Sequence, residues 1–397
     1  MNRLLLAGTL ALLACSTAQA DTPPTYYGRW GAMGSDNGQF ATPRGIGVNP
    51  WGDVYVADYN NQRVQRFTAL GAFDTAWGSF GSDTSQFIGP WDIAISKTGN
   101  VYVAEGAQQR VQEFTKDGVF VRVWGTGGTA IGQFSTPTGI AIGPNGGVYV
   151  TERANNRVQE FDLNGGFIRS WGSQGSGDGQ FIVPRGITVG NDGAVYVCDW
   201  FNDRIQKFDS TGAFLSKWDW SLIGTPNDIA TDPQGNLLVT DQANHRVVKL
   251  DTSGNVLTTF GSSGNGPGQF DTPENVAVSP YGFIYVSDSA LNLVSLFAPA
   301  GVSAPPNRPG GFAVFGSIPN PARGAGKIRF ELPAAASVTA GIYDVSGRLV
   351  RPLCENLLQS AGTHDLSWDG RGLAAGIYHV VVQSGSFSSA KKIVVLE

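Results

Sequence analysis

The amino-acid sequence predicts an all-β protein: a six-bladed β-propeller, in which the N-terminal strand closes the last blade, followed by a small β-sandwich. Three observations support this fold class. The composition favours strands and turns, a unit of about 47 residues recurs six times, and the pattern changes after residue 301. A repeat of that length with four short strands per unit is typical of propeller blades.

The composition favours strands joined by many turns. Gly and Pro account for 54 and 21 of the 397 residues, while the hydrophobic share of 41% is enough to fill a core. Charged residues make up only 15%, against about 25% in average proteins, and the net charge is −5. These values exclude a coiled coil, a polytopic membrane protein and a basic nucleic-acid binder, so we expect no nucleic-acid partner.

Residues 1–20 have the pattern of a secretory signal peptide. Arg3 supplies the positive charge, residues 4–14 form an apolar run too short for a stable membrane anchor, and a small-residue site ending at Ala20 leaves Asp21 as the mature N-terminus. Residues 12–15, Leu-Leu-Ala-Cys, offer an alternative: they resemble a lipobox, which would make the protein a lipoprotein through Cys15. Both predict export, and we expect no transmembrane segment elsewhere.

The repeat is marked by three elements in constant phase. A Trp-Gly pair ends a unit, a Gln-Phe pair follows, and a Pro comes three residues after the Phe. The fifth unit lacks the Gln-Phe pair and is five residues shorter. The aromatic positions are Trp30, Trp77, Trp124, Trp171, Trp218 and Phe260, and the prolines are Pro43, Pro90, Pro137, Pro184, Pro226 and Pro273.

Each unit contains four short apolar segments separated by turn residues. In the first unit they are residues 45–48, 54–58, 63–67 and 72–77. Helical periodicity is absent from this part of the sequence, so each unit predicts one four-stranded blade.

The number of strands predicts how the ring closes. The sixth unit, from Pro273 to about residue 301, has only three strands, and the chain begins with one spare strand at residues 26–30. We therefore expect the N-terminal strand to complete the sixth blade, which closes the ring and removes an exposed sheet edge.

The units resemble NHL repeats over about residues 26–300. The first unit has Pro-Arg-Gly-Ile-Gly at 43–47, Val-Tyr-Val-Ala-Asp at 54–58 and Asn-Gln-Arg-Val-Gln-Arg-Phe at 61–67, and the sixth unit departs most, with Leu293 in place of the Arg. The resemblance implies an NHL-type six-bladed propeller over 21–301. It does not imply one activity, because this fold includes binding proteins, sensors and a few enzymes.

A second domain is predicted after a linker. Residues 302–321 are rich in Pro, Gly and Asn and mark a linker that runs into a first strand. Alternating apolar segments follow at 327–332, 338–343, 364–368, 377–382 and 391–396, with turns such as Asp369-Gly370. About seven short strands in this length predict a β-sandwich over 322–397.

This second domain is similar to two known C-terminal modules. Asn320-Pro321, Ile342-Tyr343-Asp344, Gly347-Arg348, Trp368-Asp369-Gly370 and Gly376-Ile377-Tyr378 resemble both the Ig-like domain of flagellar hook-capping proteins and the sorting domain of type IX secretion. Either resemblance implies a secreted or cell-surface protein of a bacterial envelope, with the export machinery as a partner of the module. Cleavage of the module after export stays open.

A structural ion pair is predicted in most blades. The second strand of each unit ends in an acid, and in the first five units an Arg follows five residues later. A catalytic acid would not need to recur in every blade, so the constant spacing favours a structural role. Asp288 lacks this partner. The acids are Asp58, Glu105, Glu152, Asp199, Asp241 and Asp288, and the arginines are Arg63, Arg110, Arg157, Arg204 and Arg246.

The residues that follow each blade's Pro enter the innermost strand at the channel mouth, and they vary between blades. Polar groups that converge on a pocket are the default candidates for a binding site, and oxygen ligands from several blades suit Ca²⁺. The favoured interpretation is a solvated polar rim without metal, so no cofactor is assigned, and Ca²⁺ in the channel is the alternative. The candidate ligand-binding residues are Arg44, Trp91, Asp92, Arg185, Asn227, Asp228, Glu274 and Asn275.

Aromatic residues follow two of the strand-end acids. Tyr59, Trp200 and Phe201 lie in turns that differ strongly between blades, which also include Arg153. Loop aromatics suit the faces of sugars or peptides, so these three are further candidate ligand-binding residues. The alternative is that they fold back over neighbouring blades.

The signatures of catalysis are largely missing, and no catalytic residue is assigned. Of the three histidines only His245 lies in the propeller, which excludes a three-His zinc site there, and Cys198 occupies a strand position filled elsewhere by small residues. The leading interpretation is an exported, non-catalytic binding or scaffold protein for a protein, peptide or glycan. The alternative is a hydrolase resembling gluconolactonase-like propellers, in which Glu274, Asn275, Asn227 and Asp92 would hold a channel cation.

Overall fold

The structure, a computed structural model, describes residues 21–219, 224–299, 313–318, 325–332, 335–344, 348–360, 362–384 and 387–396. Residues 1–20, the predicted signal peptide with Cys15, lie outside these ranges, as does part of the predicted linker. The described chain is almost entirely β-strand, and its only helical elements are three short 3-10 turns, η1 (Tyr59–Asn61), η2 (Trp200–Asn202) and η3 (Gln242–Asn244). The predicted all-β class is confirmed.

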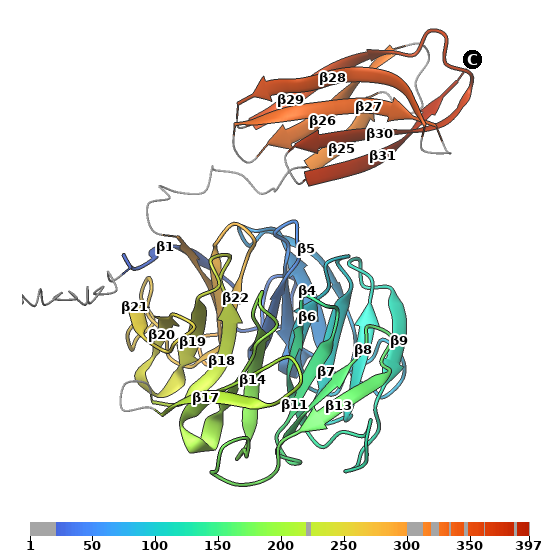
Figure 1. Cartoon of the computed structure of the whole chain (residues 1–397). Coiled ribbons are helices and arrows are strands. Elements are labelled where there is room, and N and C mark those ends of the chain that lie inside the picture. Colours follow the sequence, from blue (N-terminus) through green and yellow to red (C-terminus); the bar gives the residue numbers. More distant parts are fainter. Residues whose placement is uncertain are drawn as a thin grey trace, which may run out of the picture.

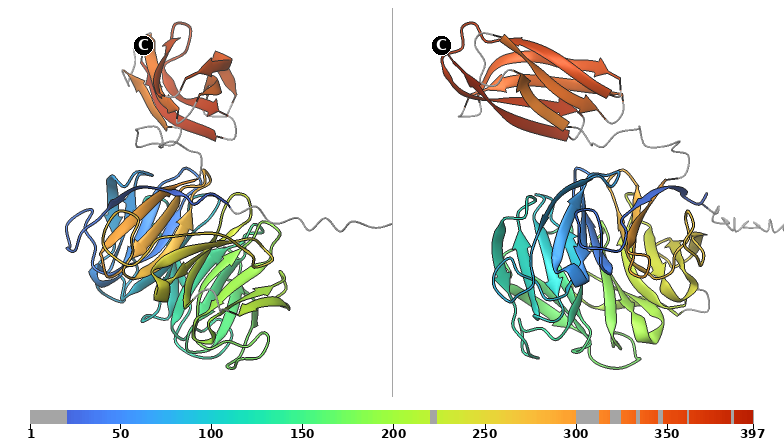
Figure 2. Two further views of the ribbon diagram at one scale, coloured as in Figure 1. Left: turned by 90° about the vertical axis from the view of Figure 1, so that its left-hand side faces the viewer. Right: turned by 180° about the vertical axis from the view of Figure 1, so that it is seen from behind.

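Residues 25–298 form six four-stranded antiparallel sheets, one for each sequence unit (Figures 1 and 2). Each innermost strand begins at the repeat's Pro and packs beside the innermost strand of the next blade, and β22 returns to β2, so the ring is closed. The strands of the first three blades are β2 (Pro43–Val48), β3 (Val54–Asp58), β4 (Arg63–Phe67), β5 (Phe73–Trp77), β6 (Pro90–Ile95), β7 (Val101–Glu105), β8 (Arg110–Phe114), β9 (Phe120–Trp124), β10 (Pro137–Ile142), β11 (Val148–Glu152), β12 (Arg157–Phe161) and β13 (Phe167–Trp171).

The other three blades repeat this arrangement, and the last is completed by the N-terminal strand. β1 (Thr25–Trp30) pairs antiparallel with β24, so Trp30 lies opposite Val294 and the sheet order is β1-β24-β23-β22. The predicted ring closure is confirmed. The remaining strands are β14 (Pro184–Val189), β15 (Val195–Asp199), β16 (Arg204–Phe208), β17 (Phe214–Asp219), β18 (Pro226–Thr231), β19 (Leu237–Asp241), β20 (Arg246–Leu250), β21 (Val256–Phe260), β22 (Pro273–Val278), β23 (Ile284–Asp288) and β24 (Leu293–Ala298).

The Trp-Gly and Gln-Phe motifs fill the interfaces between blades. Trp77 packs against Tyr55 of its own blade and Phe114 of the next, with ring centroids 6.1 and 5.8 Å apart. Gly118, at φ +81°, closes over the same indole, because a Cβ there would lie 2.6 Å from Trp77 Cδ2. The motif aromatics therefore recur because each blade buries its neighbour's rings.

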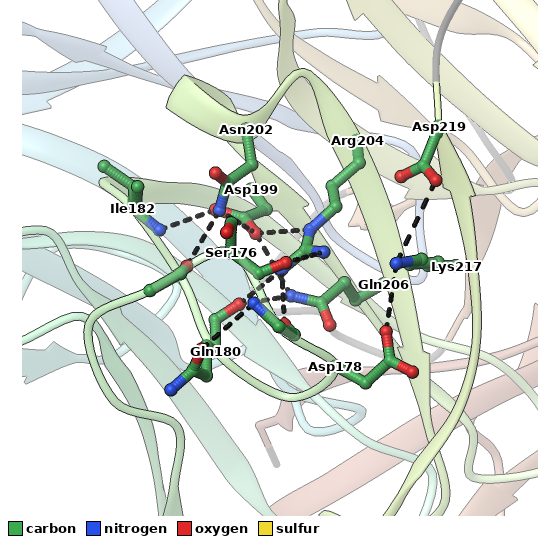
Figure 3. A network of polar contacts seen from close by, with 12 residues as sticks. Ser176, Asp178, Gln180, Ile182, Asp199, Asn202, Arg204, Gln206, Lys217 and Asp219 are labelled. Atoms are coloured by element: carbon green, nitrogen blue, oxygen red, sulfur yellow. Dashed lines mark hydrogen bonds and ion pairs between the residues drawn. The ribbon is translucent and has the colours of Figure 1, made fainter.

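The acid that ends each second strand is the centre of a buried hydrogen-bond network, shown for the fourth blade in Figure 3. Asp199 is fully buried and accepts hydrogen bonds from Arg204 Nε at 2.8 Å, Asn202 Nδ2 at 2.8 Å, Gln206 Nε2 at 3.1 Å and the Ile182 amide at 2.8 Å. Burial raises the pKa of Asp199, and these donors oppose that shift.

The arginine of this network also holds the loop that joins one blade to the next. The Arg204 guanidinium donates to the carbonyls of Ser176, Gly177 and Gln180 at 2.7 to 2.8 Å, in addition to its bond to Asp199. The same acid–arginine pair is present in the first five blades, which confirms the predicted ion pairs. Their distances lie between 2.5 and 2.9 Å, for Asp58–Arg63, Glu105–Arg110, Glu152–Arg157, Asp199–Arg204 and Asp241–Arg246.

In the sixth blade, backbone amides donate to Asp288 in place of the missing arginine. Its carboxylate accepts hydrogen bonds from the amides of Asp271 at 2.7 Å, Thr272 at 3.1 Å and Leu291 at 3.0 Å. Asp288 is therefore a satisfied structural acid rather than a group free for chemistry.

The C-terminal domain consists of two antiparallel sheets that share one apolar core. Ile328 and Trp368 from one sheet and Val338, Val380 and Ile393 from the other belong to the same buried cluster, as expected for the predicted β-sandwich. The sheets have the orders β25-β26-β29 and β28-β27-β30-β31, formed by β25 (Ala313–Ile318), β26 (Ala325–Leu332), β27 (Ala336–Tyr343), β28 (Leu349–Gln359), β29 (Gly362–Asp369), β30 (Gly376–Ser384) and β31 (Phe387–Val395).

The boundary of this domain differs from the predicted one. β25 lies within 302–321, the range predicted as a linker, and pairs with β26 from Ala313 opposite Glu331 to Ile318 opposite Lys327. The Pro- and Gly-rich flanks conceal this strand in the sequence. Among the described residues, Cys198 in β15 and Cys354 in β28 are both free thiols.

Removing the network arginine should destabilise the propeller strongly. Arg204→Ala leaves the Asp199 charge buried without its cation, so we expect a loss of about 3–5 kcal/mol in the free energy of unfolding. Lys217→Ala is the matched control, because Lys217 pairs with Asp178 at 3.0 Å with both side chains partly exposed, and its loss should stay within about 1 kcal/mol. Urea unfolding measures both variants, and equal losses would contradict the structural role.

Removing the closing strand should also destabilise the ring. A chain that begins at Gly31 loses Trp30, which packs against Phe67 and Tyr285 with ring centroids 5.8 and 6.1 Å apart, and exposes the edge of β24. A loss of about 3 kcal/mol, as for a truncated buried aromatic, lowers the melting temperature by roughly 6–12 °C. A chain that begins at Thr25 keeps the strand and is the control; identical melting curves would refute closure by β1.

Candidate functional site

The candidate site lies at the mouth of the channel, where two sets of residues from each blade meet. Pro43 at the start of β2 pairs with Asp58 at the end of β3, and the same register recurs in every blade. The residue after the Pro and the residue after the strand-end acid therefore lie at the same end of the propeller. The two sets that the sequence suggested separately form one surface.

The floor of this mouth is a layer of three buried polar side chains, Asp92, Asp228 and Asn275. Each accepts a hydrogen bond from an innermost-strand amide of the next blade: Ile140 at 2.9 Å, Val276 at 3.0 Å and Ile46 at 3.0 Å, respectively. Asn275 Nδ2 also donates across the channel to Asp92 Oδ1 at 3.0 Å. This polar layer tethers neighbouring blades at the centre of the ring.

The polar layer also divides the channel. Asp92, Asp228 and Asn275 line a cavity of about 20 Å³ on the mouth side and a wider cavity of about 190 Å³ on the opposite side, among apolar residues such as Ile140 and Val276. The smaller volume suits little more than one water molecule. The space on the mouth side of the polar layer is therefore much smaller than the space on the other side.

Burial changes the acidity of the two carboxyl groups in the layer. Desolvation raises the pKa of Asp92 to about 7, although the amides of Ile140 and Ile93 oppose the shift. Desolvation and then the Asp92 charge raise the pKa of Asp228 well above its ordinary value. Burial therefore favours the protonated form of both groups, and the charge of Asp92 adds to this effect at Asp228.

Above the layer, Asn227 links blades four, five and six. Its Nδ2 donates to Glu274 Oε2 at 2.9 Å, and its Oδ1 accepts a hydrogen bond from the Arg185 guanidinium. The other Glu274 oxygen accepts a hydrogen bond from Ser289 Oγ at 3.1 Å. Glu274 is thus held in place by neutral donors rather than by an ion pair.

Three arginines surround this centre and rest on aromatic rings. The Arg44 guanidinium lies 3.8 Å from the centre of the Trp91 ring and 4.3 Å from that of Tyr59. The Arg185 guanidinium lies 4.0 Å from the Trp200 ring, and Arg153 lies 5.3 Å from Trp91. These are cation–π distances, so the aromatic side chains orient the cations.

Two of these arginines have no acceptor. Within the described chain, the Arg44 and Arg153 guanidinium groups make no hydrogen bond or ion pair, and their Nε atoms are buried without a partner, as is that of Arg185. By contrast, the network arginine Arg204 bonds one carboxylate and three carbonyls. A buried donor without a protein acceptor costs stability, so these Nε atoms favour an acceptor supplied from outside.

Burial and neighbouring positive charge lower the pKa values of two of these arginines, Arg153 and Arg185. Burial, followed by the repulsion of Arg44, lowers the pKa of Arg153. Burial lowers the pKa of Arg185 to about 10, with Glu274 acting against the shift and Arg153 and Arg44 with it. Like charges held together in this way create a positive potential at the mouth.

The structure places the predicted mouth residues around one small cavity. Arg44, Trp91, Asp92, Arg185, Asn227, Asp228, Glu274 and Asn275 all line the small cavity, with Thr138 as a further member. Of the loop aromatics, Tyr59 and Trp200 contact the mouth arginines, whereas Phe201 is 65% exposed on the rim. Arg153 was not among the predicted site residues, although its turn position, equivalent to Tyr59 and Trp200, was a signal for it.

The oxygen atoms of the mouth are largely engaged with protein donors. Asp92 and Asp228 accept backbone amide protons, and both Glu274 oxygens accept side-chain hydrogen bonds. In the described part of the chain, no three acidic, His or Cys side chains are grouped so that they could hold a metal ion.

Among the same residues, no helix has the length and apolar character needed to cross a membrane.

Comparison with protein families identifies both parts of the chain. Residues 317–396 match the secretion system C-terminal sorting domain. Residues 40–67, 134–161 and 224–250, in units one, three and five, match the NHL repeat. The chain therefore contains NHL repeats and a C-terminal sorting domain, which is one of the two modules that the sequence resembled, and the sorting domain indicates export.

The similar proteins agree with this fold. A stretch of 48 residues is 46% identical to the B-box type zinc finger protein ncl-1 of Caenorhabditis elegans, covering 12% of this chain and only 6% of that protein. A streptogramin B lyase is 15% identical, with a TM-score of 0.50, over 68% of this chain and 97% of the lyase. A gluconolactonase from Xanthomonas campestris is 13% identical, with a TM-score of 0.50, over 71% and 99% of the two chains. At these identities the two structures show the propeller fold alone.

The buried carboxyl pair should make stability depend on pH. Because the pKa of Asp92 rises from 3.8 to about 7 in the folded state, its contribution to stability is complete below its ordinary pKa and is lost as pH rises through about 7. We expect Asp92→Asn to reduce the slope of the free energy of unfolding against pH by up to about 1.4 kcal/mol per pH unit. Melting temperatures between about pH 5 and 8 test this, with the exposed Asp36→Asn as control. Parallel pH profiles for all three proteins would refute it.

Proposed function

We propose that this protein is an exported, non-catalytic binding protein whose propeller recognises an extracellular protein, peptide or glycan at the channel mouth, while the C-terminal module serves export and surface attachment. The observation that carries the proposal is the pair of half-buried guanidinium groups, Arg44 and Arg153, that have no acceptor within the described chain. Such groups are costly in an isolated protein and become favourable when a ligand satisfies them.

The arrangement of the mouth supports binding more than catalysis. Each arginine is oriented by an aromatic ring and the floor is closed by Asp92, Asp228 and Asn275, so the surface is rigid and shallow. A preorganised surface of this kind binds with little change in shape. A hydrolase would need a base or nucleophile beside an open reaction volume.

The alternative hydrolase requires a channel Ca²⁺, and the donor set suits it poorly. Asp92 is committed to two backbone amides and to Asn275, and Arg44, Arg153 and Arg185 surround Glu274 with positive charge. Ca²⁺ sites usually have six to eight oxygen ligands with charged carboxylates among them. We therefore propose that the mouth functions without a metal ion.

Two measurements on purified residues 21–397 test this proposal. Mass spectrometry after dialysis without chelator should find less than one Ca²⁺ or transition metal per chain, and glucono-lactone should not be turned over with or without added Ca²⁺. Arrays of defined peptides and glycans should show saturable binding that Arg44→Gln/Arg153→Gln abolishes.

Lys97→Gln is the matched control for the array. Lys97 follows β6 at the opposite end of the propeller, where it bonds the Pro144 carbonyl at 3.0 Å, so its loss should leave binding unchanged. Stoichiometric metal together with lactone turnover would replace the binding proposal with the hydrolase.

A further inference from the structure

Building on the proposed function, we infer that the channel mouth binds a carboxylate from an acidic peptide segment, held between the guanidinium groups of Arg44, Arg153 and Arg185. The inference deepens the binding proposal by naming the chemistry of the ligand. It rests on three features of the mouth: its charge balance, the orientation of its arginines and the limited room above its floor.

The charge balance of the mouth is positive. Three arginines face one carboxylate, Glu274, which is bound by Asn227 and Ser289 rather than by a guanidinium group. The two deeper acids, Asp92 and Asp228, direct their oxygens to backbone amides of neighbouring blades. The acids present therefore leave the arginines uncompensated, and an additional negative charge is favourable there.

The arginines are also oriented so that they can bind a planar acceptor such as a carboxylate. Ser287 Oγ donates to the Arg44 carbonyl at 2.6 Å, and Thr151 Oγ1 donates to the Arg185 carbonyl, so both backbones are fixed. The aromatic contacts of Trp91 and Trp200 fix the guanidinium planes. A guanidinium fork binds a carboxylate through two parallel hydrogen bonds, which is the geometry that an oriented arginine favours.

The available room favours a side chain over a sugar ring. The cavity above the floor is only about 20 Å³, so it accepts the end of a group but not a ring. The faces of Trp91, Tyr59 and Trp200 already lie against guanidinium groups, so they are not open for sugar stacking. A Glu or Asp side chain, or a peptide C-terminus, reaches this depth with its carboxylate.

The test uses matched probes on the whole mature chain. Acetyl-Gly-Ser-Glu-Glu-Ser-Gly-amide, the same peptide with both Glu replaced by Gln, and oligogalacturonate are titrated at low ionic strength by calorimetry. The Glu peptide should bind at least about tenfold more tightly than the Gln peptide, the ratio expected for a charge-assisted hydrogen-bonded pair. Its affinity should fall as salt is added.

Three variants link this binding to the mouth. Arg44→Gln/Arg153→Gln should lose the preference for the Glu peptide, Arg44→Lys/Arg153→Lys should keep part of it because the charge remains without the fork, and Lys97→Gln should match the wild type. The double lysine variant also keeps the test valid if the double glutamine variant does not fold.

The other outcomes are distinct. Equal binding of the Glu and Gln peptides would overturn the carboxylate inference and leave the proposed binding function standing. Binding of oligogalacturonate alone, lost in the glutamine pair, would replace the peptide with an acidic glycan. No binding of any probe here or on the arrays would refute both proposals.

Discussion

The propeller depends on one repeated interaction, the buried carboxylate at the end of each second strand. In the fourth blade Asp199 gathers donors from the next strand, from the turn between the two strands and from the loop that arrives from the previous blade. One side chain thereby joins three segments that would otherwise leave backbone groups without partners. These donors together offset the cost of burying its charge, and the full set of Asn, Arg and Gln recurs in units one, three and four.

Arginine has two roles in this fold, and the surroundings of each side chain distinguish these roles. Arg204 is 3% exposed and every direction of its fork meets an oxygen atom, so it is structural. Arg44 and Arg153 rest on the Trp91 ring and meet no oxygen within the described residues. The contacts of Arg204 stabilise the fold. The arrangement of Arg44 and Arg153 has no such structural role, which favours the mouth as the functional site.

Much of this architecture could be predicted from the sequence because it repeats. The blade boundaries and the acid–arginine pairs each follow from a spacing that recurs along the chain, and the closing role of residues 26–30 follows from the number of strands. The positions after each Pro could be assigned to the mouth for the same reason. The repeat does not specify the direction of a side chain that departs from it, so the contact of Tyr59 and Trp200 with the mouth arginines, and the membership of Arg153, required the structure.

Two further limits of the sequence have simple physical causes. Strand β25 occurs only once and lies between Pro- and Gly-rich segments, so no periodicity distinguished it from a linker. Asp92 and Asn275 are hydrogen-bonded to each other although they lie 183 positions apart in the sequence. Such a contact follows from ring geometry and cannot be derived from local pattern.

Closure of the ring by the first strand has a consequence for the order in which the protein assembles. The partner of β1 lies more than 260 residues later in the sequence, because Thr25 pairs with Ala298. Contacts of such long sequence separation form slowly, so the first strand must remain unpaired while the other blades are made. Residue 298 precedes the sorting domain by only a short segment. A chain whose sorting domain has been synthesised has therefore also acquired every strand needed to close the propeller.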